Sequence, residues 1–354
     1  MTPFNIYRKT MIFSWMKFGI GMLILFVCLA IGGLTWFVIG NMEFSLLTSI
    51  AIACGAFLVI VAIGYLIMSR LGYSIKTGHL AIIERAHGGQ DVPSNPVEFS
   101  KTVVSGRFGS SRKFYMNARS IASTIRELVR VIMRGFSLTR DTPDVHSGRW
   151  LKYLISLPAL HCADECCMTY ALRHHDYEVN AAIVDALTIL VQSWDRFINK
   201  ALKVSIGHIL LCLATFAIFF VPGFFICRNL GVNTIPWLGT ALVLTFTVKI
   251  AFFDSYVLSK IVCDFLTIAD ETQIEAKNYV KLDSWSKQYA SLRRAAEKAA
   301  EKAEDEADRA ERAAKKAAAK EKKQEKAAES SDESKPSETE SATESTEAGE
   351  DSRQ

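Results

Sequence analysis

The chain lacks the sequence signatures of the common nucleotide-binding and hydrolytic enzymes. Its 354 residues contain no G-x-x-x-x-G-K-[ST] or G-x-G-x-x-G loop, no H-E-x-x-H zinc helix and no G-x-S-x-G nucleophile turn. These absences exclude the enzyme classes that depend on such motifs. We therefore predict no catalytic residue and no cofactor, and we favour a protein that is not an enzyme.

The sequence also lacks a disulfide framework and a cleavable signal. Its eight cysteines do not follow the spacing of small secreted domains or of zinc knuckles. The first apolar stretch is too long for a signal peptide, and a second stretch follows at once. We expect most of the thiols to behave as small apolar side chains.

Four long apolar stretches dominate what is present. They cover residues 18–39, 46–69, 205–227 and 236–258. Each has about 20 residues, enough for a helix to cross a hydrocarbon core of about 30 Å. The sequence therefore predicts an all-α integral membrane protein, in which two transmembrane helical hairpins (four spans) flank a helical cytoplasmic domain.

The basic residues predict the orientation of these spans. The short turns at residues 40–45 and 228–235 carry one charged residue each. The opposite ends of the spans are basic, at Arg8, Lys9, Lys17, Arg70, Lys76, Lys200 and Lys203. By the positive-inside rule, we predict a multi-pass protein of the cell membrane with both termini and the middle domain in the cytoplasm.

Composition divides the chain into seven segments. Residues 70–204 carry 18 Lys and Arg against 12 Asp and Glu, a net charge of +6, whereas the end of the chain has few large apolar groups. Such an end cannot bury a core. The predicted segments are a cytoplasmic N-terminus (1–17), a first hairpin (18–69), a basic helical domain (70–204), a second hairpin (205–262), a juxtamembrane segment (263–290), a charged Ala/Glu/Lys-rich helix (291–328) and an acidic disordered tail (329–354).

A basic amphipathic helix is predicted over residues 117–138. Apolar residues recur at three- and four-residue spacing, and Arg119, Arg126, Arg130 and Arg134 lie away from that stripe. Two interpretations stay open. The helix could lie among anionic headgroups as a membrane-surface element, or its apolar face could pack on the rest of the middle domain.

Ionisable residues in the second hairpin form a candidate intramembrane polar site. His208 lies in the third apolar stretch, and Lys249 and Asp254 lie in the fourth. Charged residues are costly in lipid and face the bundle or water. Because residues five apart lie about 140° apart on an α-helix, we expect a poor direct pair between Lys249 and Asp254. The alternatives are a polar pocket and a snorkelling Lys249 with an interfacial Asp254.

A candidate thiol or metal cluster comprises His161, Cys162, Glu165, Cys166 and Cys167. On a helix, residues four apart share a face, and zinc sites use three or four such ligands. The favoured alternative is a set of buried thiols, with Asp164 and Glu165 at the polar edge of the helix or paired with a basic neighbour. We predict no bound metal.

Two stretches carry a resemblance to known proteins. Residues 164–167 (DECC) and 249–256 (KIAFFDSY) resemble a group of multi-pass membrane proteins of anaerobic Gram-positive bacteria, to which no activity is assigned. This resemblance covers about residues 5–285. A weaker resemblance, over about 40 residues, is to choline transporter-like proteins: Phe252 to Tyr256 and then Asp264, Asp270 and Glu271. It implies no substrate-binding residue.

Three functions are compatible with these features. The leading hypothesis is a scaffold or membrane organiser that acts through its cytoplasmic face, with the bilayer, anionic inner-leaflet lipids and a protein that docks on the C-terminal tail as partners. The second is a transporter or channel component working as a homo-oligomer. The third is a lipid-modifying enzyme that uses His161, Asp164 and Glu165. We predict no nucleic-acid partner.

Overall fold

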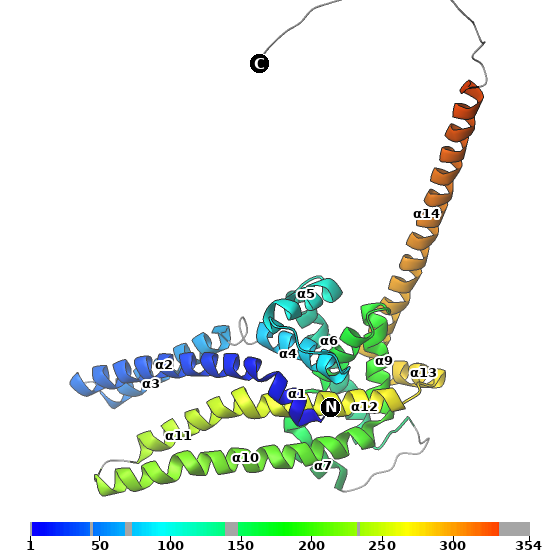
Figure 1. Cartoon of the computed structure of the whole chain (residues 1–354). Coiled ribbons are helices and arrows are strands. Elements are labelled where there is room, and N and C mark those ends of the chain that lie inside the picture. The colour runs from blue at the N-terminus through cyan, green and yellow to red at the C-terminus, as the bar shows by residue number, and fades with distance from the viewer. Residues whose placement is uncertain (1, 43–44, 68–72, 139–147, 232–233, 333–354) are drawn as a thin grey trace, which may run out of the picture. The chain divides into compact units, whose positions relative to one another are not determined.

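The described part of the chain is built from helices. The computed structural model describes residues 2–42, 45–67, 73–138, 148–231 and 234–332 (Figure 1). The all-α prediction is confirmed for these residues, none of which lies in a strand. The elements are α1 (Pro3–Lys9), α2 (Met11–Asn41), α3 (Leu46–Ile67), α4 (Tyr73–His87), α5 (Pro96–Phe108), α6 (Ser111–Met133), α7 (Gly148–Leu160), α8 (Ala163–Arg173), α9 (Val179–Gln192), α10 (Trp194–Asn229), α11 (Ile235–Val248), the π-helical turn η2 (Lys249–Phe253), α12 (Asp254–Glu271), α13 (Ala276–Trp285) and α14 (Lys287–Asp332).

Four helical stretches are long and apolar enough to cross a membrane. They are α2, α3, α10 and the stretch Trp237–Glu271, which joins α11, η2 and α12. α2 packs against α3, and α10 packs against α11, as Figure 1 shows. Large apolar side chains such as Phe26, Phe57 and Leu213 are exposed along them. Such surfaces suit contact with lipid, so the four helices are consistent with a membrane protein.

The largest buried core is formed mainly by the helices that follow and precede the exposed apolar stretches. It joins side chains of α4, α6, α8 and α9 to the first turns of α10 and to most of α12. Tyr289 of α14 is fully buried in this core, and its hydroxyl lies 2.6 Å from the Thr188 hydroxyl of α9. The C-terminal half of the stretch Trp237–Glu271 is therefore part of this buried core as well as part of a candidate span.

Helix α6 buries its apolar face in that core. Ile121 and Leu128 are at most 1% exposed, and the helix packs on α8, α9 and α13. Of the two interpretations of the basic amphipathic helix, packing on the middle domain therefore holds for this face. The opposite, basic face is exposed, including Arg119, Arg126, Arg130 and Arg134.

Helix α10 begins after a break in the chain and continues through a proline. Helix α9 ends at Gln192, the chain breaks at Ser193, and α10 begins at Trp194. At the other end α10 continues through Pro222 to Asn229, although proline removes one backbone hydrogen bond. The neighbouring Gly223 allows a close approach, because a Cβ there would lie 1.7 Å from the Trp237 ring of α11.

Helix α14 changes character along its length. The compact part of the chain ends at Lys298, and the second unit runs from Ala299 to Gln354. All side chains from residue 300 to residue 317 are exposed. Residues 329–332, placed in the disordered tail by composition, continue the helix, and residues 333–354 lie outside the described part.

Candidate functional site

Polar side chains from six elements gather where the apolar helices meet the buried core. Together they form what we call the polar layer, and most are buried or half-buried. Its members are Thr10 and Lys17 near the start of α2, Lys76 and His79 of α4, Glu165 of α8, Ser205 and His208 of α10, Lys249 of η2, and Asp254, Ser255 and Ser259 of α12.

A π-helical turn brings Lys249 and Asp254 together. The Asp254 amide donates to the Lys249 carbonyl, five residues earlier, so these residues share one face of the helix. The Lys249 Nζ lies 3.0 Å from both carboxylate oxygens of Asp254. The expectation of a poor direct pair is therefore wrong, because it assumed α-helical geometry. The turn converts two isolated charges into a bidentate ion pair.

His208 completes this group from the neighbouring helix. Its Nε2 lies 3.5 Å from Asp254 Oδ1, and its Nδ1 is buried without a hydrogen-bond partner. Cys212, one turn later on α10, lies 3.8 Å from the same Nε2. The three residues predicted as an intramembrane polar site thus lie together, centred on one carboxylate.

Lys17 enters the polar layer from α2. Its Nζ donates to Ser255 Oγ at 2.9 Å, and Ser255 in turn donates to the Ala251 carbonyl at 2.7 Å. Ala251, Ser255 and Ser259 are four residues apart and fully buried. Small residues at this spacing let two helices approach closely in lipid. The contact joins the first and fourth apolar stretches.

His79 ties α4 to the same two stretches. Its Nε2 lies 2.9 Å from the Thr10 hydroxyl and 3.5 Å from the Ser259 hydroxyl, and its ring stacks on Phe13 with centroids 5.5 Å apart. Burial, with Lys17 as a smaller contribution, holds the pKa of His79 well below its usual value. The imidazole is therefore neutral and serves as a hydrogen-bonding link.

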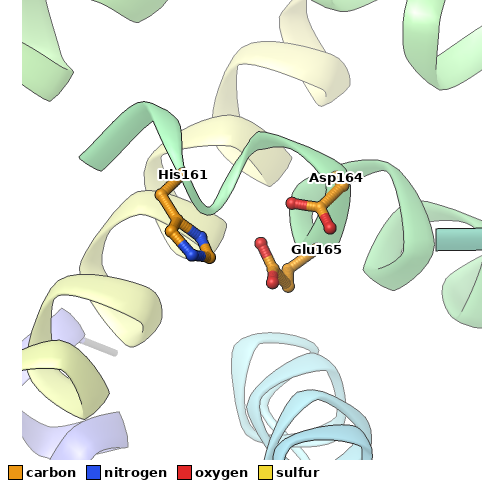
Figure 2. Close-up of side chains that lie close together, drawn as sticks. All are labelled: His161, Asp164 and Glu165. Atoms are coloured by element: carbon orange, nitrogen blue, oxygen red, sulfur yellow. The ribbon is translucent and has the colours of Figure 1, made fainter. Parts of the chain in front are cut away.

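An ion-paired cluster lies next to this link, where α4 meets α8. Lys76 pairs with Glu165, whose side chain is nearly fully buried. Potential ligand atoms of His161, Asp164 and Glu165 lie within 4.8 Å of one another, and Figure 2 shows these side chains pointing toward a common space. Burial, partly offset by Lys76, raises the pKa of Asp164. A metal ion here would compete with the ammonium group already paired to Glu165.

The thiols of the predicted cluster are buried rather than grouped with these ligands. Cys166 and Cys167 are fully buried in the main core, and Cys162 is nearly so. Burial raises the pKa of Cys162 to about 12 and that of Cys166 well above its usual value. A thiol is a nucleophile or metal ligand only as the thiolate. The geometry therefore favours apolar packing for these three side chains.

Sequence reasoning missed Lys17, Lys76 and His79, which it counted as flanking or ordinary helix residues. A signal existed for Lys17: Thr10, Ser14 and Lys17 recur at helical spacing and mark one polar face at the start of an apolar helix. No such spacing identifies Lys76 or His79, because their partners lie on other helices.

Comparison with known proteins identifies no relative: no family model, curated protein or solved structure matches this chain.

Coupling between Lys249 and Asp254 can be measured with a double-mutant cycle. We expect Lys249→Met and Asp254→Asn each to lower the free energy of unfolding in mixed micelles. The double variant should lose less unfolding free energy than the two single variants lose together, and the difference should be about 0.5–3 kcal/mol. The exposed pair Lys302–Glu306, on a regular helix, is the control and should show almost no coupling. Strict additivity at Lys249 and Asp254 would contradict the pairing.

Thiol reactivity provides a second test. Because the raised pKa leaves almost no Cys162 thiolate at pH 8, N-ethylmaleimide should not modify Cys162, Cys166 or Cys167 in the folded protein. The variant His161→Cys places a thiol at an exposed neighbouring position, where modification should be rapid. Peptide mapping by mass spectrometry separates the sites. Equal rates at positions 161 and 162 would show that the cluster is open.

Proposed function

We propose that the chain is a multi-pass membrane scaffold that acts without catalysis. In this proposal the four apolar helices cross the cell membrane as two hairpins, and the core built on α4–α9 and α12 lies at its cytoplasmic face. The second unit, from Ala299 onward, binds a partner. The basic residues that flank the spans on one side support this orientation.

One observation carries the proposal: α14 is anchored at one end and exposed at the other. Tyr289 is fully buried and Arg293 pairs with Asp283 at 2.7 Å, so the first turns of α14 belong to the compact unit. From residue 300 to residue 317 the helix presents only exposed side chains. An exposed helix rich in Lys and Glu gains no stability from packing. A binding surface for another protein is a use that this arrangement supports.

The polar layer supports the same proposal as a structural device. Its hydrogen bonds and ion pairs join α2, α4, α8, α10 and α12, so the spans and the core are held together. A scaffold must hold its partner-binding domain at a fixed position relative to the bilayer. Catalysis, in contrast, would need several reactive groups with access to substrate. Of the candidates His161, Asp164 and Glu165 only His161 is exposed, and the thiols and His79 are buried.

Transport is the second candidate, and a specific observation favours it. His208, Lys249 and Asp254 form a titratable group within two of the apolar helices. Intramembrane charges of this kind often mark ion or proton paths. Four spans per chain would then require an assembly of several copies.

Truncation tests the scaffold proposal. A chain that ends at Lys298 should keep the melting temperature of the full chain, because the anchoring turns of α14 remain, but it should lose partners captured by cross-linking in cells. A chain that ends at Asp332 is the matched control that keeps the exposed helix. Quantitative mass spectrometry compares the three. An unchanged set of partners in the Lys298 truncation would refute a docking role for the second unit.

Proteoliposomes separate transport from scaffolding. If the protein carries ions or protons, a pH-sensitive or ion-sensitive dye should report a flux that Asp254→Asn lowers at least tenfold, since the substitution removes the central carboxylate. The exposed substitution Asp195→Asn is the control. If the correctly folded and oriented unmodified protein gives no flux over a panel of common ions, the transport hypothesis is refuted and the scaffold proposal remains.

A further inference from the structure

A groove with one basic wall lies between α6 and α7. It has a volume of about 450 Å³ and is open on one side. Its lining residues are Ser123, Arg126, Val129, Arg130, Met133, Arg134, Trp150 and Tyr153. The groove therefore combines positive charge with apolar and aromatic surface.

The basic wall comes from the last turns of α6 and the residue that follows the helix. Arg126, Arg130 and Arg134 are four residues apart, so their side chains follow one line along the helix. All three are exposed, and no carboxylate of the described residues forms an ion pair with them. The nearby Glu127 is engaged elsewhere, since its Oε2 accepts a hydrogen bond from Ser286 at 2.6 Å. Asp164 interacts with Arg126 electrostatically but does not form an ion pair with it, so among the described residues this wall is available to an anion.

The second wall belongs to a helix with an exposed apolar stripe. Trp150 is 62% exposed, and Leu151, Leu154 and Leu157 of α7 are also exposed. Helix α7 packs along α10, and the Ala159 amide donates to Ser205 Oγ at 3.2 Å where the third apolar stretch begins. Helix α7, which carries these side chains, thus adjoins the end of a candidate span, the level at which Trp and Tyr gather in membrane proteins.

We propose that this groove binds the headgroup of an anionic phospholipid. The guanidinium groups of Arg126, Arg130 and Arg134 bind the phosphate, for which the planar donor fork of Arg is well suited. Trp150 and the leucines of α7 contact the acyl chains. The inference rests on the proposed position of this core at the inner face of the membrane, where anionic lipids are abundant.

The apolar wall is what favours a lipid over other phosphates. A free phosphate or an acidic peptide would use the arginines but would leave Trp150 and the leucine stripe uncovered. A lipid satisfies both walls at once. The basic helix therefore serves the membrane through its exposed face, while its apolar face remains in the protein core.

Binding by the purified full chain in detergent tests this proposal. The probes are dioctanoyl-phosphatidylglycerol, dioctanoyl-phosphatidylcholine and inorganic phosphate, with affinity read by microscale thermophoresis. We expect the anionic lipid to bind more tightly than the zwitterionic one, with an affinity that falls as salt rises. The double substitution Arg126→Gln/Arg130→Gln should weaken binding by roughly ten- to thirtyfold, the loss expected for two surface arginines.

Matched controls make the result specific. Arg112→Gln/Arg119→Gln removes two exposed arginines of the same helix that do not line the groove, and affinity should stay within about twofold because screened charges outside contact distance contribute little. Trp150→Ala should weaken the lipid but not inorganic phosphate. Equal binding of both lipids, an equal loss in the control variant, or full competition by inorganic phosphate would overturn the proposal.

This test can fail independently of the scaffold proposal. Lipid binding is measured on isolated protein, whereas the scaffold is tested by truncation at Lys298, which leaves the groove intact. The orientation has its own readout in Arg130→Cys: labelling of this thiol by an impermeant maleimide in intact cells would refute the cytoplasmic placement without affecting the affinity measurement.

Discussion

Every charged group that lies among apolar helices needs a partner, and the structure is organised around that requirement. An unpaired ammonium or carboxylate in a region of low dielectric constant costs several kcal/mol or more. Lys249 and Asp254 become partners through a local change of helix type, whereas Lys17 and Lys76 find their partners on other helices. The π turn is thus an economical solution, because one wider turn places two charges on one face.

Partnering of polar groups also explains why the apolar helices and the buried core behave as one compact unit. His79 reaches both α1–α2 and α12, Glu165 receives Lys76 from α4, and Ser205 accepts the Ala159 amide of α7. Each of these links crosses between elements far apart in the sequence. The small side chains at Ala251, Ser255 and Ser259 make such contacts possible, since bulkier residues would hold the helices apart.

Local patterns in the sequence were sufficient for the helices and insufficient for their contacts. The long apolar stretches and the amphipathic spacing of residues 117–138 follow directly from hydrophobicity and helical period. The Lys249–Asp254 pair was missed because a single wider turn has no signature in composition, and periodicity calculated at 3.6 residues per turn places the two side chains apart. The core position of α6 was left open, because an apolar face has the same pattern whether it covers lipid or protein. The partners of Lys76 and His79 depend on tertiary structure, which a single sequence does not reveal.

The uninterrupted course of α10 has a mechanical consequence. Its 36 residues begin in the buried core at Trp194 and end beyond Pro222 at Asn229, which corresponds to a rod of roughly 54 Å at the rise of an α-helix. The first turns of this rod are fixed in the core, because Trp194, Phe197 and Ala201 are buried there and the helix packs on α7, α9 and α12. Any tilt that bilayer thickness or a neighbouring molecule imposes on the outer end therefore acts directly on these core contacts, because the helix runs without a break from Trp194 to Asn229.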